Sequence, residues 1–384
     1  MPLLIVALTS LFAVASAAPV AAPTSAPAQS AKPSPAGATH QQSPGEDSDP
    51  PLTPQQKADF AANMRYRHGV EQSLRNSASP RDWALSTQML EFDDPGSLGG
   101  PNPARAALLR KAAEAAPKDR LVQLIWANAQ PENSGCDAQH PCANRPEALA
   151  MLEPDNGVGW IPVINTASKA NNAAGINHAL ARMAIATRYD EMFGEAMNAW
   201  VGVYRRYPPS IELVRQMPTS APVDLELVEQ VYAMSEVVTM VMPAYQSLVN
   251  ACKREKQPDA GVSRFENCGN AGRLMLNQST NMIGRMMGRA LLRVSGTANA
   301  SDIEAARVLA WQFEQYGQPL AKTSIEPAAS RAYFADLEES GSEVVAIQMQ
   351  LRRAGVSLTP PANWQPTRDG KPISPLGEAP ASAK

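Results

Sequence analysis

Histidine carries much of the acid–base and metal chemistry of proteins, and this 384-residue chain has four: His40, His68, His140 and His178. None lies in an H-E-x-x-H zinc motif. The chain also lacks a G-x-S-x-G nucleophile elbow, a glycine-rich phosphate loop and a C-x-x-C pair. His178 is the one candidate general base, and it would need a carboxylate partner supplied by the fold; its place off the apolar face of its predicted helix also suits an ordinary surface residue. We therefore expect no cofactor, no metal and no catalytic motif.

The chain contains four cysteines: Cys136, Cys142, Cys252 and Cys268. An even number is typical of an exported chain whose cysteines are all paired. Three pairings exist, and proximity in the sequence favours Cys136–Cys142 and Cys252–Cys268. A proline and a glycine lie between the second two cysteines, so we expect a helical hairpin with a disulfide at its mouth. Cys136, His140 and Cys142 could instead bind a metal, but the cysteines are spaced more widely than in most zinc sites.

A predicted helix over residues 267–294 carries a row of arginines spaced four residues apart, with methionines beside them. The residues on this face are Met282, Arg285, Met286, Arg289 and Arg293. No acidic residue occurs between positions 267 and 300, so the helix has none of the acid–base pairs of an ordinary solvated face. Guanidinium groups bind carboxylates and phosphates, and methionine adapts to varied apolar groups. This pattern is compatible with two interpretations. In one, the arginines pair with Glu304 or Glu314 of an adjacent helix while the methionines fill the core; in the other, the helix presents a partner-binding face.

The elements that must position these residues are predicted to be helices. Alanine and methionine are plentiful, and only 5% of residues are aromatic, which favours helix over strand. Apolar residues recur at helical spacing, for example at Leu121, Leu124 and Ile125. Start signals recur as well, such as Thr53 before a proline and the capping box at 301–304. We expect an all-α fold of paired antiparallel helices in an irregular, solenoid-like arrangement.

A long helix is predicted over residues 224–256, with Pro243 inside it. Proline removes one helical hydrogen bond and clashes with the preceding turn, so a kink or break is expected there. No charged residue occurs between Glu236 and Lys253. A helix without a charged face is buried on several sides, so this segment should form the spine of the second half of the chain.

Composition divides the chain into four parts. Residues 1–17 contain an apolar run followed by Ala-Ser-Ala, which is typical of a cleaved signal peptide and too short to span a membrane. Residues 18–52 are rich in proline, alanine and serine and predict a disordered tether. A helical domain should occupy 53–357, with a sub-boundary near 208–223, and a proline-rich tail follows at 358–384. No transmembrane segment is expected in the mature chain.

Two stretches resemble tetratricopeptide repeats. AAEAAPKDRLVQLIW (112–126) and LAMLEPDNGVGWIPVINTA (149–167) each join helices through a proline turn, and their prolines are 37 residues apart, near the 34-residue period of that family. Trp160 follows Pro154 by six residues, as the repeat's tryptophan follows its proline. The resemblance implies a helical-repeat arrangement over about 112–187. The segments SASPRDWAL, LVQLIWAN and LEPDNGVGW also resemble exported proteins of gammaproteobacteria, which implies no particular activity.

These observations narrow the function without fixing it. A net charge of −3 and a pI of 5.9 exclude a dedicated nucleic-acid binder. Helical arcs present extended surfaces to partners, so we expect a periplasmic or secreted binding scaffold for a protein or another cell-envelope component. The alternative is a periplasmic hydrolase that uses carboxylates brought together by the fold, with His178 as a further candidate. A buried, closely spaced pair of carboxylates in a cleft would favour the hydrolase.

Overall fold

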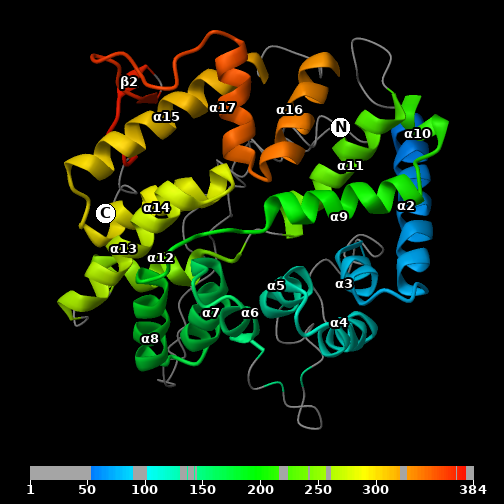
Figure 1. Cartoon of the computed structure of the whole chain (residues 1–384), viewed down its shortest axis with the longest axis horizontal. Helices are drawn as coiled ribbons and strands as arrows, with labels where there is room; N and C mark the ends of the chain where they lie inside the picture. The colour runs from blue at the N-terminus through cyan, green and yellow to red at the C-terminus, as the bar shows by residue number, and fades with distance from the viewer. Residues whose placement is uncertain are drawn as a thin grey trace, which may run out of the picture. The chain divides into compact units, whose positions relative to one another are not determined.

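The computed structural model describes Cys136, Cys142 and residues 53–89, 102–129, 145–215, 224–240, 243–256, 261–320, 327–368 and 370–377. This part of the chain contains 16 α-helices and one short hairpin, which confirms the predicted all-α fold class (Figure 1). The predicted signal peptide and tether, with His40 and His140, lie outside the described residues. The described residues divide into two units, a first that ends at Ala61 and a second that begins at Ala62. In the first, Thr53 caps a helix by accepting a hydrogen bond from the Gln56 N–H at 3.2 Å.

Four helices open the described chain: α2 (Pro54–Arg75), α3 (Pro80–Met89), α4 (Pro103–Ala115) and α5 (Arg120–Asn128). Polar side chains satisfy the free N–H groups at the start of α4 and α5, as helix capping requires. The Asn102 side chain accepts from Arg105 N–H at 3.0 Å, and the Asp119 side chain accepts from Leu121 N–H at 3.1 Å. The helices α3, α4 and α5 pack against one another through fully buried leucines at 85, 109 and 121.

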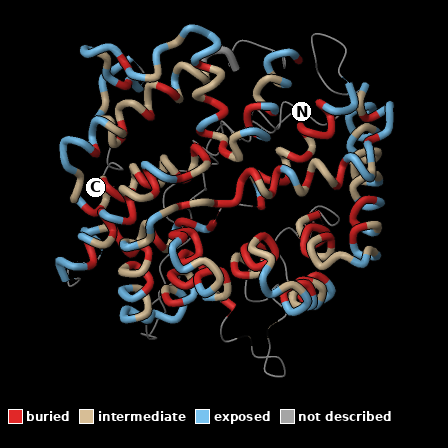
Figure 2. The backbone as a smooth tube through the Cα atoms, in the orientation of Figure 1, coloured by how far each residue is buried: buried red, intermediate tan, exposed pale blue. Residues whose placement is uncertain are grey.

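The next elements run through the middle of the second unit: α6 (Ala148–Leu152), the 3₁₀ helix η3 (Gly157–Trp160), α7 (Ile161–Lys169), α8 (Ala173–Ala184), α9 (Phe193–Arg206) and α10 (Ile211–Arg215). Trp160, the residue that carries the repeat resemblance, ends η3 and is buried. The tetratricopeptide-like arrangement itself stays a prediction. Helix α9 lies among other helices, and Figure 2 colours much of its length as buried. Trp200 and Tyr204 of α9 are completely buried.

Helix α9 packs on α11 (Leu225–Met240), which α12 (Gln246–Cys252) and the 3₁₀ helix η4 (Arg254–Lys256) follow. The single helix predicted over 224–256 is therefore divided, and the expected break at Pro243 is confirmed. The uncharged stretch around it is buried at Val237, Met240 and Leu248, as its composition predicted.

The prediction of a single helix over 267–294 is wrong, because the structure has two helices there, α13 (Val262–Gln278) and α14 (Met282–Ser295). The chain leaves helical geometry at Ser279, whose ψ is 136°, and Asn281 caps α14 by accepting from Gly284 N–H at 2.7 Å. The physical reason lies outside the segment. The carboxyl group of Glu191 accepts the Thr280 N–H at 2.9 Å, so this amide is not available to a continuous helix.

The chain ends in α15 (Ala300–Leu320), α16 (Pro327–Ser340), α17 (Glu343–Arg353) and a hairpin of β1 (Thr367–Arg368) and β2 (Lys371–Pro372). The cap of α15 lies two residues before the predicted capping box, because Asn299 and Asp302 exchange hydrogen bonds of 2.9 Å. A second, smaller core joins α13, α14, α15 and α17. The tail packs on α15, where Trp364 meets Trp311 edge to face at 5.3 Å.

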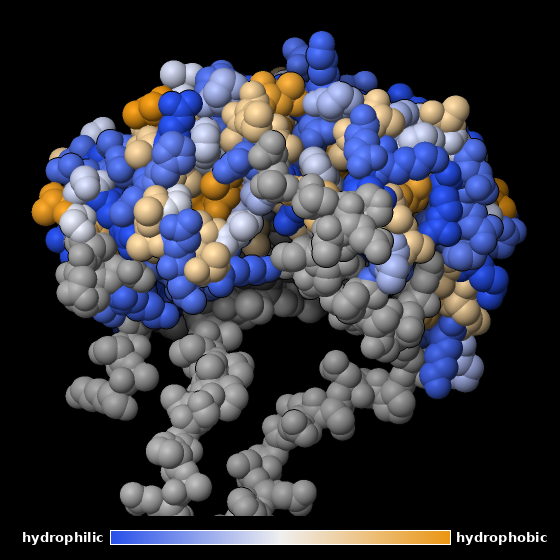
Figure 3. Space-filling model, turned by 90° about the horizontal axis from the view of Figure 1, so that it is seen from below, coloured by the Kyte–Doolittle hydropathy of each residue, from blue (hydrophilic) through white to orange (hydrophobic). Residues whose placement is uncertain are grey.

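Hydrophilic residues predominate on the face in Figure 3, and apolar residues lie scattered among them. Exposed large apolar side chains in the second unit come from separate elements, among them Met151, Ile185, Ile211 and Val262. No helix in the described ranges combines the length and the apolar character needed to cross a membrane.

Helix α9 touches the turn between α16 and α17 without any side chain in between. A Cβ atom at Gly194 would overlap the Cα of Gly341, whose φ of +65° forms that turn. Gly202 on the same helix has open space where a Cβ would be. The two glycines therefore form a matched pair for testing the contact.

We expect Gly194→Ala to lower the free energy of unfolding by about 1–3 kcal/mol, because the added methyl group overpacks the contact. Gly202→Ala should raise it by roughly 0.5–1 kcal/mol, because alanine favours the helix. Urea denaturation of both variants measures the difference. Equal stability of the two would contradict the close packing of α9 on this turn.

Candidate functional site

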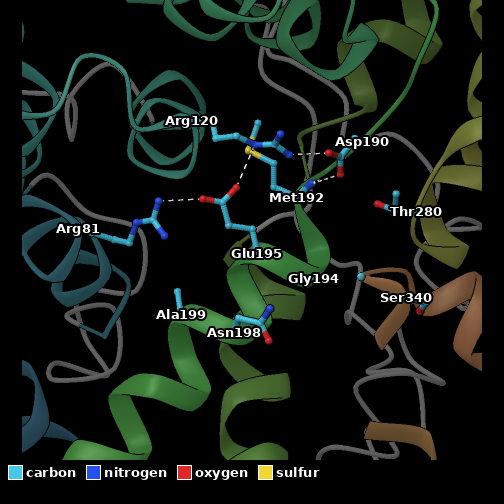
Figure 4. Close-up of a pocket in the computed structure, with 11 residues that line it drawn as sticks. Arg81, Arg120, Asp190, Met192, Gly194, Glu195, Asn198, Ala199, Thr280 and Ser340 are labelled. Atoms are coloured by element: carbon cyan, nitrogen blue, oxygen red, sulfur yellow. Dashed lines mark hydrogen bonds and ion pairs between the residues drawn. The ribbon is translucent and has the colours of Figure 1, made fainter. Parts of the chain in front are cut away.

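An open cleft of about 580 Å³ lies where α3, α5, the segment before α9, α9 itself and two interhelical turns meet (Figure 4). One wall carries Arg81 of α3 and Arg120 of α5. The floor is the first part of α9 with Asp190 and Met192 before it, and the opposite side is formed by Thr280, Ser340 and Gly341. The cleft is therefore bounded mainly by charged and polar groups.

Two arginines and two carboxylates of the cleft form a connected network. The Arg81 guanidinium is 2.8 Å from both Asp119 and Glu195. Arg120 lies 2.9 Å from Glu195 and 2.5 Å from Asp190, so Glu195 bridges the two arginines. The hydrogen bond from Arg81 to Asp119 raises the pKa of Arg81, and Glu195 raises it further.

The network remains reachable from solvent. The four side chains that line the cleft are 26–38% exposed. Partly exposed ion pairs contribute about 0–1 kcal/mol each to stability, so their partners can be exchanged at little energetic cost. A ligand carboxylate can therefore replace Glu195 on Arg81, and a ligand cation can replace an arginine on Asp190.

The segment leading into α9 has an unusual backbone. Met192 has φ +60° and ψ 29° in the left-handed region, which costs of order 1 kcal/mol for a residue with a side chain. Its N–H donates to the Asp190 side chain at 2.8 Å, and the buried Asn156 amide group donates to the Asp190 carbonyl at 2.9 Å. These bonds hold Asp190 at the cleft while the neighbouring Glu191 is completely buried.

Glu191, beside the cleft, is a buried carboxyl group with a raised pKa. One oxygen accepts from the Ser279 hydroxyl, and the other accepts from both the N–H and the hydroxyl of Thr280 at 2.9 Å. Burial raises the pKa of Glu191 to about 7, although these hydrogen bonds act in the opposite direction. The half-buried Glu343 accepts from the Met282 N–H at 2.8 Å, and partial burial raises its pKa too.

The predicted disulfides are confirmed as cysteine pairs at bonding distance. The Cα atoms are 5.3 Å apart for Cys136–Cys142 and 5.7 Å apart for Cys252–Cys268. The second pair connects the end of α12 to α13. No group of histidine, cysteine and acidic residues suited to a metal ion occurs among the described residues.

The predicted candidate base is not part of the cleft. His178 lies on α8, and its ring meets that of Trp160 edge to face at 6.0 Å. No residue of the arginine–methionine face lines the cleft either. His178 and the arginine–methionine face, which the sequence singled out, are therefore not part of the site where the fold brings Asp190 and Glu195 together.

The arginine–methionine face is only partly as predicted. Arg285, Arg289 and Arg293 share one side of α14, but Met282 is 3% exposed and Met286 packs against the smaller core. The methionines are therefore not free to contact a partner, because α14 turns them toward α15 and α17. The alternative pairing with Glu304 or Glu314 is also not observed among the described residues. Glu304 forms its ion pair with Arg307, and Glu314 forms none with the three arginines.

Sequence analysis missed Glu191 and the cleft network. Asp190 and Glu191 are adjacent acidic residues in front of an apolar pair, a pattern too common to single out. Their partners are far away in the chain, with Arg120 lying 70 residues before Asp190. Only the fold brings these groups together.

Comparisons with known proteins identify no relative: no family model, curated protein or solved structure matches this chain.

The raised pKa of Glu191 gives a pH prediction with a definite sign. The folded state favours the protonated carboxyl, so its stabilising effect is complete below pH 4.5 and is lost as the pH rises to about 7. From about pH 5 to pH 8, the wild type should lose about 3 kcal/mol of unfolding free energy relative to Glu191→Gln. Glutamine mimics the protonated acid at every pH.

Denaturation of both proteins across this pH range measures the effect, and their difference removes contributions from other titrating groups. A difference that does not change with pH would show that Glu191 does not titrate near neutrality.

Proposed function

We propose that this chain is a periplasmic or secreted helical binding scaffold, and that the cleft at Arg81, Arg120 and Glu195 holds a polar segment of a partner from the cell envelope. The observation that carries the proposal is the bridging of two partly exposed arginines by one carboxylate at 2.8 and 2.9 Å. Such a network is preorganised for a ligand that presents a carboxylate of its own.

The charged groups of the cleft limit which kinds of ligand can bind there. Guanidinium groups bind carboxylates through paired hydrogen bonds, while Asp190 and Glu195 offer acceptors for amines and amides. A peptide segment with both kinds of group fits this mixture. A purely apolar ligand would leave the four charged side chains of the cleft without ligand partners.

The cell compartment is part of the same proposal. Two disulfides suit an oxidising environment, and the expected signal peptide would direct the chain there. A scaffold in the envelope meets peptide and protein segments that carry free carboxylates.

A hydrolase is the second candidate function, and one observation favours it. Glu191, with a pKa of about 7, lies between Asp190 and Met192, which both line the cleft. A carboxyl group with this pKa can both donate and accept protons near neutral pH. However, Glu191 is fully buried and both its oxygens are engaged by Ser279 and Thr280. Hydrolysis would require these bonds to open.

Site-specific photo-crosslinking in the producing cell tests the scaffold proposal. A benzophenone amino acid at Asn198, an exposed residue of the cleft floor, should capture one envelope component reproducibly. The same label at Val262, which is 74% exposed on α13, should not capture it. The Arg81→Gln, Arg120→Gln double variant should reduce the yield of the adduct at least about tenfold, because it removes both carboxylate-binding groups.

Arg331→Gln is the matched control, since Arg331 is an exposed, ion-paired arginine that does not line the cleft. It should capture the component as the wild type does. Equal yields from the cleft variant and the control would refute the scaffold proposal. The hydrolase would be supported by a different outcome: the wild type is crosslinked only to cleavage products of the component, whereas Glu191→Gln is crosslinked to the intact component.

A further inference from the structure

We propose that Arg285, Arg289 and Arg293 of α14, together with the Leu376–Gly377 turn of the tail, form a binding site for a phosphate group. This site does not depend on the cleft or on the function proposed for it. These three arginines, called the arginine stripe below, are distinguished by their partners, by the turn that lies against them and by the charge around them.

Arg285, Arg289 and Arg293, the arginine stripe, have hydrogen-bond partners unlike those of other arginines in the second unit. Arg67, Arg206, Arg273 and Arg353 each form an ion pair with a buried carboxylate. Among the described residues, no carboxylate lies within ion-pair distance of the stripe. Arg285 donates to the Ser279 carbonyl at 3.1 Å, and Arg293 donates to the Leu376 carbonyl at 3.2 Å.

Some N–H donors at the centre of the stripe have no acceptor among the described residues. Arg289 makes no hydrogen bond or ion pair with the described residues, and the buried Nε of Arg293 has no acceptor among them. A guanidinium group carries five N–H donors in a planar fork. Phosphate offers several acceptor oxygens with matching geometry, so one phosphate can accept from two of these forks.

The tail places its backbone against the guanidinium groups. A Cβ at Gly377 would lie 2.7 Å from Arg293 Nη1 and 2.9 Å from Arg289 Nη2, and the residue has φ +80°. The positive φ favours glycine here, and the absence of a Cβ lets the chain lie against the two guanidinium groups without displacing them. The turn is held by a 2.8 Å hydrogen bond from the Gly377 N–H to the Ser374 carbonyl.

The electrostatic surroundings favour an anion with more than one charge. Burial is the main cause that lowers the pKa of Arg289 to about 10, and the charges of Arg293 and Arg368 contribute to the same shift. Burial also lowers the pKa of Arg285, with Glu191 as an opposing charge. Positive charges that destabilise one another in a partly buried place become favourable when a dianion binds between them. This distinguishes phosphate from a single carboxylate.

Two sources share this chemistry, free phosphate and the phosphate of a lipid headgroup. The first arm of the test titrates sodium phosphate into the processed protein and uses sodium chloride at matched ionic strength as the control. Near 100 times the Kd, phosphate should raise the Tm by about 4 °C above the chloride control. Arg289→Gln should keep the Tm of the wild type or exceed it without phosphate, and should lose at least about tenfold in phosphate affinity.

Arg352→Gln, a change at an exposed arginine on α17, should respond to phosphate as the wild type does. Should Arg289→Gln fail to fold, Arg289→Lys retains the charge but loses the fork, and calorimetric titration should still show weaker phosphate binding. The proposal is overturned if phosphate and chloride act alike, or if Arg289→Gln and Arg352→Gln respond equally.

The second arm uses vesicles of phosphatidylcholine with or without phosphatidic acid. Binding that requires phosphatidic acid and Arg289 identifies a lipid phosphate as the source, whereas binding of free phosphate alone identifies a soluble phosphate compound. Glu378 follows Gly377 in the sequence and could supply the anion from within the chain. In that case Glu378→Gln lowers the Tm and phosphate has no effect, which overturns the proposal.

Discussion

The carboxyl group of Glu191 accepts hydrogen bonds from Ser279 and Thr280, and these bonds hold the break between α13 and α14 against the segment that leads into α9. The Thr280 carbonyl in turn accepts from the Val344 N–H at 3.3 Å and from the Ser342 hydroxyl at 3.0 Å. Three segments distant in the sequence therefore meet at one buried polar junction. Both oxygens of the Glu191 carboxyl group are hydrogen-bonded there, which is what makes a polar group tolerable in an apolar core.

Both proposed binding sites are built outward from this junction. Thr280 lines the cleft on one side, and the Ser279 carbonyl fixes Arg285 at the beginning of the arginine stripe on the other. Because the pKa of Glu191 is about 7, deprotonation near neutral pH places a buried negative charge next to both. A ligand that binds either site therefore binds against a framework whose stability depends on that proton.

The sequence predicted what local physical chemistry determines. Helical spacing and proline gave the all-α class and the break at Pro243, and proximity gave both cysteine pairs. The break at Ser279 could not be predicted, because the polar run at 279–281 is compatible with a helix and its acceptor, Glu191, lies 88 residues earlier. The burial of Met282 was missed for a related reason: a sequence shows which residues share a face of α14, but not that α15 and α17 cover its methionine side.

Amide hydrogen exchange at Thr280 measures the junction directly, since this N–H donates to Glu191 at 2.9 Å. In Glu191→Ala, protection of the Thr280 amide should fall at least about tenfold more than protection of the α5 amides, because local opening no longer breaks a hydrogen bond to a buried carboxyl. Unchanged protection at Thr280, or an equal loss at Thr280 and throughout α5, would contradict the view that Glu191 holds this junction together.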